Sequence, residues 1–345
     1  ICEITSGSTP KTGVSEYWDG NIKWITPAEL NDDTYIITDS VRKITELAVK
    51  QTGLSPIPKG TVILSSRAPI GKVAIAGCEM YCNQGFKNLI CSEKIDNRYL
   101  YWFLKGNTEF LNSLGRGATF KEISKSIVAS IEINVPDLKE QLVVVENLEK
   151  INRIITLRKK ELNELDNLIR ARFVEMFGDP ISNPYRYDKV PLSELADIKI
   201  GPFGSLLHKE DYIEGGHPLL NPSHIADGKI LSDDKLTISD EKYEELSAYQ
   251  LKTGDVVMGR RGEMGRCAVV PRDGFLCGTG SILIRTKGEI TADYIQKIIS
   301  FPSFKKSIED MAVGQTMPNL NVPIVSRFQI IKPPMEVQDR YYKFV

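Results

Sequence analysis

The chain has 345 residues, of which 41% are hydrophobic and 26% are charged, a composition typical of one large or two ordinary globular domains. Its 44 basic and 45 acidic residues leave a formal net charge of -1, which excludes a protein that is basic all over but allows a local basic face. The sequence contains no apolar run long enough to cross a membrane and no secretory signal, so we expect a cytoplasmic protein without a membrane span.

Motifs of common enzyme chemistry are missing from the sequence. It contains neither of the two common glycine-rich phosphate-binding loops and no Gly-x-Ser-x-Gly nucleophile motif. It has no Glu-x-Lys triplet, and its acidic residues are not clustered as a nuclease metal requires. The six cysteines include no Cys-x-x-Cys pair, which favours free thiols over a zinc site. The sequence therefore favours a binding protein without catalytic residues or a metal.

The first part of the chain reads as a β-rich stretch followed by short helices. Runs of β-branched residues bounded by glycine or proline predict strands at 22–26, 61–65, 72–76 and 87–91. Two helices are expected at 96–104 and 108–114, followed by a Gly-Thr loop and a strand that ends at Asn134. The aromatic residues of the opening segment are assigned to the core and not to nucleic-acid stacking, namely Tyr17, Trp18 and Trp24.

A long helix is predicted next, from Leu138 to Phe177. Asp137 can cap its start with Glu140 three residues later, and Gly178 ends it. These 40 residues would extend about 60 Å. Apolar residues recur along it with heptad spacing, and we expect the following ones to meet a partner helix: Leu148, Ile151, Ile155, Leu162, Leu165 and Ile169. The alternative is a helix that packs along one domain.

The rest of the chain repeats the first part. Arg67 and Arg261 lie 194 residues apart in similar segments. The glycines of these segments match at the same offset, Gly60 with Gly254 and Gly71 with Gly265. Tyr294 follows Tyr99 by 195 residues, and Gln338 follows Gln141 by 197, with the order of all matches kept. The second copy predicts strands and helices in the same order: strands at 255–258, 267–270 and 281–285, helices at 292–299 and 303–311, and a strand that ends at Lys332.

This layout resembles the specificity subunit of a type I restriction-modification system. The long helix ends in FVEMFGDP (173–180), and SGSTPKTGVSEYWDGNIKWIT (6–26) resembles the opening of one class of target-recognition domain. Three strings of the second copy resemble another class, namely GPFGSLLHKEDY (201–212), NPSHIADGKI (221–230) and GRRGEMGR (259–266). Their order, spacing and duplication together carry the resemblance.

The resemblance implies an α/β (α+β) fold. Two pseudo-repeated target-recognition domains with mixed β-sheets would be separated by long helices that form an antiparallel coiled coil. The expected boundaries are 1–136 for the first recognition domain, 137–180 for the long helix, 181–334 for the second domain and 335–345 for the second helix. Because the chain opens on Ile1 and its second helix would begin only near Met335, we expect an incomplete N-terminus and a truncated second helix.

The resemblance also implies a function. Each domain would read one half of a bipartite double-stranded DNA target. The helices would dock modification (methyltransferase) subunits, two in number, and a restriction/translocase subunit would cut the DNA. S-adenosylmethionine, ATP and Mg²⁺ would belong to these partners, and this subunit would hold no cofactor. The alternatives are the DNA-binding scaffold of a methyltransferase-only complex, a fused DNA-modifying enzyme, and a scaffold that binds no DNA.

The candidate DNA-binding residues are basic or amide side chains in glycine-containing loops. Lys and Arg bind phosphates, Arg also pairs with guanine, and Asn or Gln pairs with adenine. The densest basic loop holds Arg260, Arg261 and Arg266, and its counterpart holds Arg67 and Lys72. The Gly-Thr loops and one further loop add the remaining candidates: Arg116, Thr119, Lys121, Gln315, Thr316, Asn319 and His208. The alternatives are a solvated basic hairpin and a purely structural turn.

Overall fold

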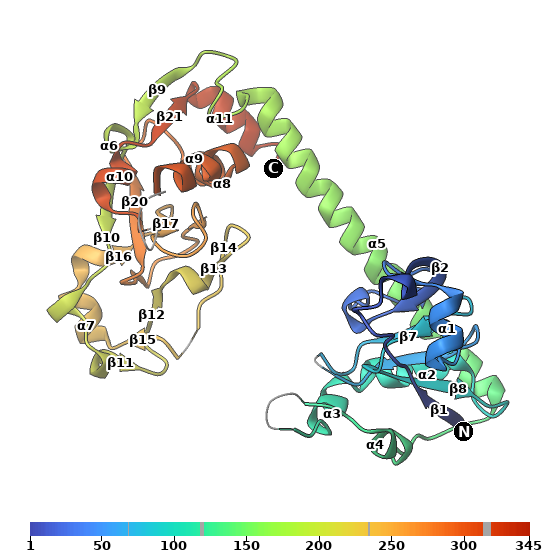
Figure 1. Cartoon of the computed structure of the whole chain (residues 1–345). Coiled ribbons are helices and arrows are strands. Elements are labelled where there is room, and N and C mark those ends of the chain that lie inside the picture. The colour runs from blue at the N-terminus through green and yellow to red at the C-terminus, as the bar shows by residue number, and fades with distance from the viewer. Residues whose placement is uncertain (68, 118–120, 234, 313–318) are drawn as a thin grey trace. The chain divides into compact units, whose positions relative to one another are not determined.

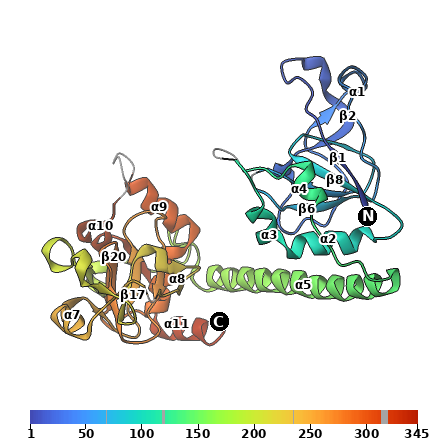
Figure 2. The same cartoon turned by 90° about the horizontal axis from the view of Figure 1, so that it is seen from below.

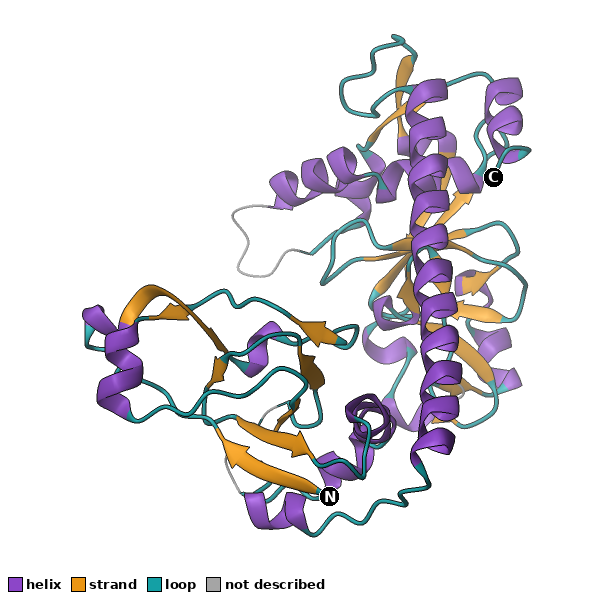
Figure 3. Ribbon diagram, turned by 90° about the vertical axis from the view of Figure 1, so that its right-hand side faces the viewer, coloured by secondary structure: helices purple, strands orange, loops and turns teal. Residues whose placement is uncertain are grey.

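The computed structural model describes residues 1–67, 69–117, 121–233, 235–312 and 319–345. The chain divides into two compact units, Ile1–Glu161 and Leu162–Val345. The division falls within α5 (Leu138–Phe177), which is drawn as one uninterrupted helix in Figures 1 and 2. Both units combine strands with helices (Figure 3).

The first unit is built on two mixed sheets. The larger sheet has the strand order β1 (Cys2–Ser6), β8 (Phe86–Cys91), β5 (Val62–Ser65), β6 (Val73–Ala76) and β3 (Ile36–Ile37). The smaller sheet has the order β4 (Lys43–Ile44), β2 (Trp18–Ile25) and β7 (Tyr81–Cys82). The pairs β3-β6 and β2-β7 are parallel and the other pairs antiparallel, so the predicted mixed sheets are confirmed.

The second unit repeats this design. Its sheet β10 (Ala196–Ile200), β20 (Ser281–Thr286), β17 (Val256–Gly259) and β18 (Cys267–Val269) has the same order and directions as β1-β8-β5-β6. Its parallel pair β12 (His217–Leu220) and β19 (Phe275–Cys277) repeats β2-β7. Further strands of this unit are β9 (Asp188–Pro191), β11 (Tyr212–Ile213), β13 (Ile225–Ala226), β14 (Lys229–Ile230), β15 (Thr237–Ile238), β16 (Gln250–Leu251) and β21 (Gln329–Lys332).

Short helices follow the sheet in each unit. In the first unit they are α2 (Asn97–Gly106), α3 (Thr108–Ser113) and α4 (Lys125–Ala129), with α1 (Glu46–Thr52) earlier in the chain. In the second unit they are α8 (Ala292–Ser300), α9 (Pro302–Ala312), α10 (Val322–Ser326) and α11 (Met335–Tyr342), with α6 (Leu192–Leu195) and α7 (Asp240–Glu245) earlier. Single-turn 3-10 helices lie at Ser15–Tyr17, Pro27–Glu29, Gly204–Leu206, Lys209–Asp211, Pro222–His224 and Ser247–Tyr249.

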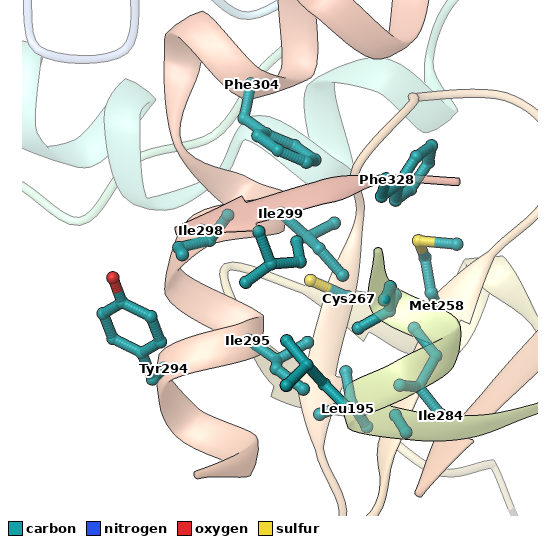
Figure 4. Packing of buried hydrophobic residues seen from close by; sticks show 14 of the residues in the cluster. Leu195, Met258, Cys267, Ile284, Tyr294, Ile295, Ile298, Ile299, Phe304 and Phe328 are labelled. Carbon is teal, nitrogen blue, oxygen red and sulfur yellow. The ribbon is translucent and has the colours of Figure 1, made fainter. Parts of the chain in front are cut away.

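The core of the second unit forms where α8 packs on the sheet. One face of α8 is fully buried because its apolar residues recur at helical spacing, namely Tyr294, Ile295, Ile298 and Ile299. Figure 4 shows Ile295 and Ile299 near Cys267 of the sheet strands, whereas Tyr294 lies farther from Met258 and Ile284. In the first unit, α2 buries Leu100, Tyr101 and Leu104 in the same way. The predicted core position of Trp24 is also confirmed, since it is only 2% exposed.

The predicted strand ending at Asn134 is wrong, because residues 131–137 form no strand. Its counterpart in the second unit, β21 (Gln329–Lys332), is a strand because it pairs antiparallel with β9 (Asp188–Pro191). No described residue of the first unit forms such a ladder with 131–134. Without a neighbouring strand, the backbone N–H and C=O groups of this segment have no ladder partners, so it is not a strand. Ile131, Ile133 and Val135 still pack against the first core.

A buried glutamine fixes the start of α5, and another fixes the start of α11. Gln141, in the first turns of α5, is fully buried. Its Oε1 accepts a hydrogen bond from the backbone N of Asp96 at 2.9 Å, and its Nε2 donates to the carbonyl oxygens of Lys94 and Pro136 at 3.0 and 2.8 Å. Asp96 is the N-cap of α2, so this single side chain joins the starts of two helices.

Gln338 makes the equivalent contacts in the second unit. It is also fully buried, in α11. Its Oε1 accepts from the backbone N of Thr291, the N-cap of α8, at 3.0 Å. Its Nε2 donates to the carbonyl oxygen of Pro333 at 2.9 Å. The repeat seen in the sequence is therefore a repeat of hydrogen bonds as well as of elements.

The bounds of α5 agree with its predicted start and end. Asp137 caps the helix, since its Oδ1 accepts from the backbone N of Glu140 at 2.9 Å. Gly178 follows the last residue with φ at 75°, which a residue with a Cβ rarely adopts. Between these ends, four of the heptad residues are 48–63% exposed in the described chain: Ile151, Ile155, Leu162 and Leu165. Leu148 and Ile169 are partly buried.

We expect Gln141→Leu to destabilise the first unit by at least about 2 kcal/mol, because the backbone N of Asp96 and two carbonyl oxygens lose their partner in a buried place. The three tryptophans, Trp18, Trp24 and Trp102, all lie in the first unit, so tryptophan fluorescence during urea unfolding reports on that unit alone.

Gln338→Leu is the matched control, because it removes the corresponding hydrogen bonds to Thr291 and Pro333 in the second unit. It should leave the tryptophan transition in place and shift the far-UV circular dichroism transition instead. Equal fluorescence shifts for the two variants would contradict separate roles for the two glutamines.

Candidate nucleic-acid interface

The loops that hold most candidate residues meet at one end of the central sheet in each unit. In the second unit, β10 and β17 end opposite the start of β20, with Ile200 paired to Ile282 and Gly259 to Ser281. The backbone N of Arg260 donates to the carbonyl oxygen of Gly280 at 3.0 Å. The basic loop and the glycine loop before β20 therefore lie side by side.

The second candidate segment joins them there. The backbone N of Leu320 donates to the carbonyl oxygen of Arg260 at 2.9 Å. In the first unit, the backbone N of Ser66 donates to Gly85 O at 2.8 Å, and that of Ile123 to Ser66 O at 3.0 Å. We call this surface the loop edge. It comprises Thr9, Arg67, Gln84, Arg116, Lys121 and Glu122 in the first unit, and Phe203, Arg260, Arg261, Thr279 and Asn319 in the second.

Close backbone contacts explain why both loop edges have a glycine at the same position, Gly7 in the first unit and Gly201 in the second. A Cβ on Gly7 would collide with the carbonyl oxygen of Asn83, and one on Gly201 with that of Gly278. Only glycine lets the segment after β1 or β10 lie this close to the loop before β8 or β20. The backbone of the loop edge is thus shared by the two units, while its side chains differ.

The three arginines of the densest basic loop have different roles. Arg266 is partly exposed but tied to its own unit, because its guanidinium donates to Glu263 Oε2 at 2.8 Å and to Pro222 O at 3.2 Å. Arg260 donates to Leu320 O at 3.2 Å, and partial burial together with the nearby charge of Arg261 lowers its pKa. Arg261 is exposed, and its side chain has no hydrogen-bond partner among the residues that the structure describes.

Glu263 links this loop to α9. It accepts from Lys305 at 2.8 Å as well as from Arg266, and these hydrogen bonds lower its pKa to about 2. Its carboxylate is therefore charged throughout the neutral range. Arg266 and Lys305 thus anchor the loop through one carboxylate. Arg261 takes no part in this network and faces outward.

The basic residues of the first unit divide in the same way. Lys72 points inward, since its Nζ donates to the carbonyl oxygen of Leu30 at 2.5 Å. Arg116 and Lys121 are exposed, and the backbone of Arg116 exchanges two hydrogen bonds with that of Glu122 at 3.0 and 2.9 Å. Arg67 is half exposed and donates through Nε to Glu122 Oε2 at 2.9 Å.

The other candidates are less well placed. Thr119, Gln315 and Thr316 lie outside the described residues. Asn319 lies at the loop edge, and its Oδ1 is buried without a hydrogen-bond partner in the described chain. His208 is exposed at the start of the 3-10 helix Lys209–Asp211, where its backbone N donates to Asp211 at 2.6 Å.

Residues that the sequence did not single out also lie at the loop edge. Glu122 and the buried Lys87 form an ion pair beneath Arg67. Thr9 donates to Gln84 Oε1 on the first edge, and Phe203 is 63% exposed at the matching place of the second. Gln84 lies in CNQG (82–85), which matches CGTG (277–280) in the repeat, and Phe203 lies in GPFGSLLHKEDY (201–212). The sequence therefore shows these motifs but not the exposure of their side chains.

The described residues show no other obvious chemical centre. No group of three or more His, Cys, Asp or Glu side chains among them could hold a metal ion. All six cysteines are free. No helix in the described part of the chain is both long and apolar enough to cross a membrane.

Two copies of one four-strand order, each with a loop edge and joined through one long helix, define a duplicated binding protein. The chain belongs to the family of type I restriction-modification DNA specificity domains, because the sequence profile of that family matches residues 1–167 and again 184–345. The two matches show that the chain carries two such domains.

Known proteins of this family resemble the whole chain. The specificity subunit of the type I restriction enzyme MjaIX from Methanocaldococcus jannaschii is 30% identical, over 100% of this chain and 84% of that protein. The S subunit of a type I restriction-modification system from M. genitalium has the same fold, with a TM-score of 0.56 at 16% identity over 99% of this chain and 85% of that one. A chain from a structural study of complex assembly in the type I system gives a TM-score of 0.58 at 18% identity, over 100% and 86% of the two chains.

We expect Arg266→Ala to lower the stability of the second unit by about 1 kcal/mol, since it removes hydrogen bonds to Glu263 and Pro222 from a partly exposed position. Arg261→Ala should change stability by less than about 0.5 kcal/mol, because it removes no described contact. Urea unfolding followed by far-UV circular dichroism measures both. A larger loss for Arg261→Ala than for Arg266→Ala would contradict the division of roles between these arginines.

Proposed function

We propose that this chain is the DNA-reading subunit of a type I restriction-modification complex. Each unit binds one half of a bipartite double-stranded DNA target through its loop edge, and the chain performs no catalysis itself. The observation that carries the proposal is the repetition of one loop edge, with an exposed arginine at the same place, in two DNA specificity domains. Relatives named as specificity subunits support it.

The differences between the two edges support two different half-sites. Equivalent backbone positions carry Gln84 or Thr279 and Glu122 or Asn319. Base edges in the major groove are distinguished by such donors and acceptors, whereas contacts to phosphates carry no sequence information directly. A shared backbone with different side chains therefore suits a pair of readers with different sequence preferences.

The exposed stripe of α5 supports the partner assignments. Apolar side chains that stay half exposed over several turns, such as Ile151, Ile155 and Leu162, are typical of a helix that meets other helices. We infer that this stripe takes part in an antiparallel coiled coil and docks two modification subunits. S-adenosylmethionine would then be bound by those subunits, and ATP and Mg²⁺ by a restriction/translocase subunit. We expect the complex to act in the cytoplasm, where the DNA is.

The alternatives are weaker. A fused DNA-modifying enzyme is not favoured, because DNA specificity domains account for almost the whole chain. A scaffold of a methyltransferase-only complex would use the same DNA-reading surface and differ only in the absence of a restriction subunit. Co-purification with and without that subunit's gene, followed by a cleavage assay, distinguishes the two.

Exchanging one unit should change one half of the target. We expect replacement of residues 187–331 by the second domain of another family member to alter one half-site and leave the other intact, because each unit has its own sheet and core. Sequencing of methylated motifs in cells that carry the hybrid complex measures this. A change in both half-sites would show that the units do not read independently.

Arg261 should contribute directly to DNA affinity. We expect Arg261→Ala to weaken duplex binding by about 1–3 kcal/mol if the guanidinium meets a base. If it meets a phosphate, binding to all sequences weakens and the salt dependence drops by about one unit of slope. Fluorescence anisotropy with specific and random duplexes over a range of salt separates these results. Unchanged affinity on both duplexes would place the loop away from DNA.

A further inference from the structure

A three-residue charge network lies under the loop edge of the first unit. Lys87, on β8, is only 5% exposed, and its Nζ lies 3.3 Å from Glu122 Oε1 and 3.2 Å from Ser66 Oγ. The other oxygen of the same carboxylate, Oε2, accepts from Arg67 Nε at 2.9 Å. Glu122 thus divides its two oxygens between a buried cation beneath it and a half-exposed cation beside it.

The position of Glu122 is fixed on every side. Its backbone pairs with that of Arg116, and the next residue, Ile123, is tied to Ser66 by a backbone hydrogen bond of 3.0 Å. The buried ammonium of Lys87 requires a negative partner, since an uncompensated buried charge is strongly unfavourable. Partial burial alone would raise the pKa of Glu122, but the hydrogen bonds from Arg67 and Lys87 outweigh it, and the pKa is lowered. The carboxylate is therefore charged at neutral pH.

This network leaves the Arg67 guanidinium held at one end and open at the other. Only Nε is used, and the two Nη atoms have no hydrogen-bond partner among the described residues. An arginine fixed in this way presents a planar pair of donors with little remaining side-chain freedom, which matches the O6 and N7 acceptors of guanine. A phosphate can also accept a bidentate arginine, but a freely moving cation satisfies it as well, so a phosphate contact gives no reason to fix the guanidinium in place.

We propose that Arg67 reads a guanine in the first half-site, with Glu122 and Lys87 as the residues that position it. The assignment rests on the proposed function and specifies one base contact within it. Glu122 would touch no base itself. Its role is to reduce the conformational freedom that Arg67 loses on binding.

The second unit provides an internal comparison. Arg261 occupies the place of Arg67, but Asn319 stands in the place of Glu122 and the buried Ile282 in that of Lys87. No carboxylate fixes Arg261 in the described chain, so the matching position of the second half-site is not read by the same device. The second half-site therefore serves as a control within every binding experiment.

The test is a selection of duplexes from a randomised library by the full-length protein, purified with its co-expressed modification subunits. Wild type is compared with Arg67→Lys, Glu122→Gln and the double variant Lys87→Met/Glu122→Gln, and Arg261→Lys is the matched control in the other unit. Arg67→Lys keeps the charge but removes the planar donor pair. The double variant removes the buried charge together with its partner, and so guards against a loss of folding in Glu122→Gln.

We expect one guanine of the wild-type motif to lose preference by roughly 5- to 100-fold in Arg67→Lys, the range for a bidentate base contact. Glu122→Gln and the double variant should relax the same position by roughly 2- to 10-fold, and all other positions should stay unchanged. Arg261→Lys should leave that guanine selected as in wild type.

A wild-type motif that persists unchanged in all Arg67 and Glu122 variants would overturn this assignment and leave the proposed function intact. A uniform loss of affinity in Arg67→Lys, with every base preference kept, would overturn it too and make Arg67 a phosphate contact. If wild type enriched no motif at all, the proposed function itself would fail, and the guanine contact with it.

Discussion

The architecture depends on one contact, the buried glutamine at the start of α5 and its counterpart at the start of α11. Gln141 and Gln338 each connect the first turns of a helix to the N-cap of the helix that covers the sheet. An amide can do this because it donates and accepts at once, whereas an apolar side chain would leave the buried backbone groups unpaired. At the far end of α5, Phe173 and Phe177 are buried against Tyr294 and Tyr341 of the second unit. The helix is therefore anchored at both ends, and its exposed stripe lies between the anchors.

At the loop edge, the backbone maintains the fold of each unit and the exposed side chains select the ligand. Backbone hydrogen bonds such as Ile123 to Ser66 and Leu320 to Arg260 are the same in both copies. They involve no side chain, so the exposed residues beside them can change without loss of the loop edge. Thr9 with Gln84 on one edge and Phe203 with Thr279 on the other illustrate this freedom. A repeated scaffold can therefore carry two unrelated readers.

The sequence predicted what depends on local patterns. The runs of β-branched residues located β5, β6 and β8, and Asp137 with Gly178 marked the ends of α5, because capping and turn chemistry act over a few residues. The repeat was visible because its anchors are glycines, a proline and the glutamines. The strand at 131–134 failed because a strand exists only with a partner, and for β21 that partner is β9, more than a hundred residues away.

The candidate site was predicted less well, because the state of a basic side chain depends on distant partners. Arg266 and Lys72 read as surface cations in the sequence, yet both donate to groups inside their units, Pro222 O and Leu30 O, that lie 44 and 42 residues away. Lys87 was not singled out, although it supports the loop edge from below through Glu122. The number of lysines and arginines in a loop therefore overestimates how many of them are free to contact DNA. What distinguishes an outward-facing arginine such as Arg67 or Arg261 is whether a carboxylate fixes its orientation. Arg67 is fixed by Glu122, which lies 55 residues further along the chain. The residues next to Arg67 or Arg261 in the sequence therefore do not show which of the two arginines is fixed.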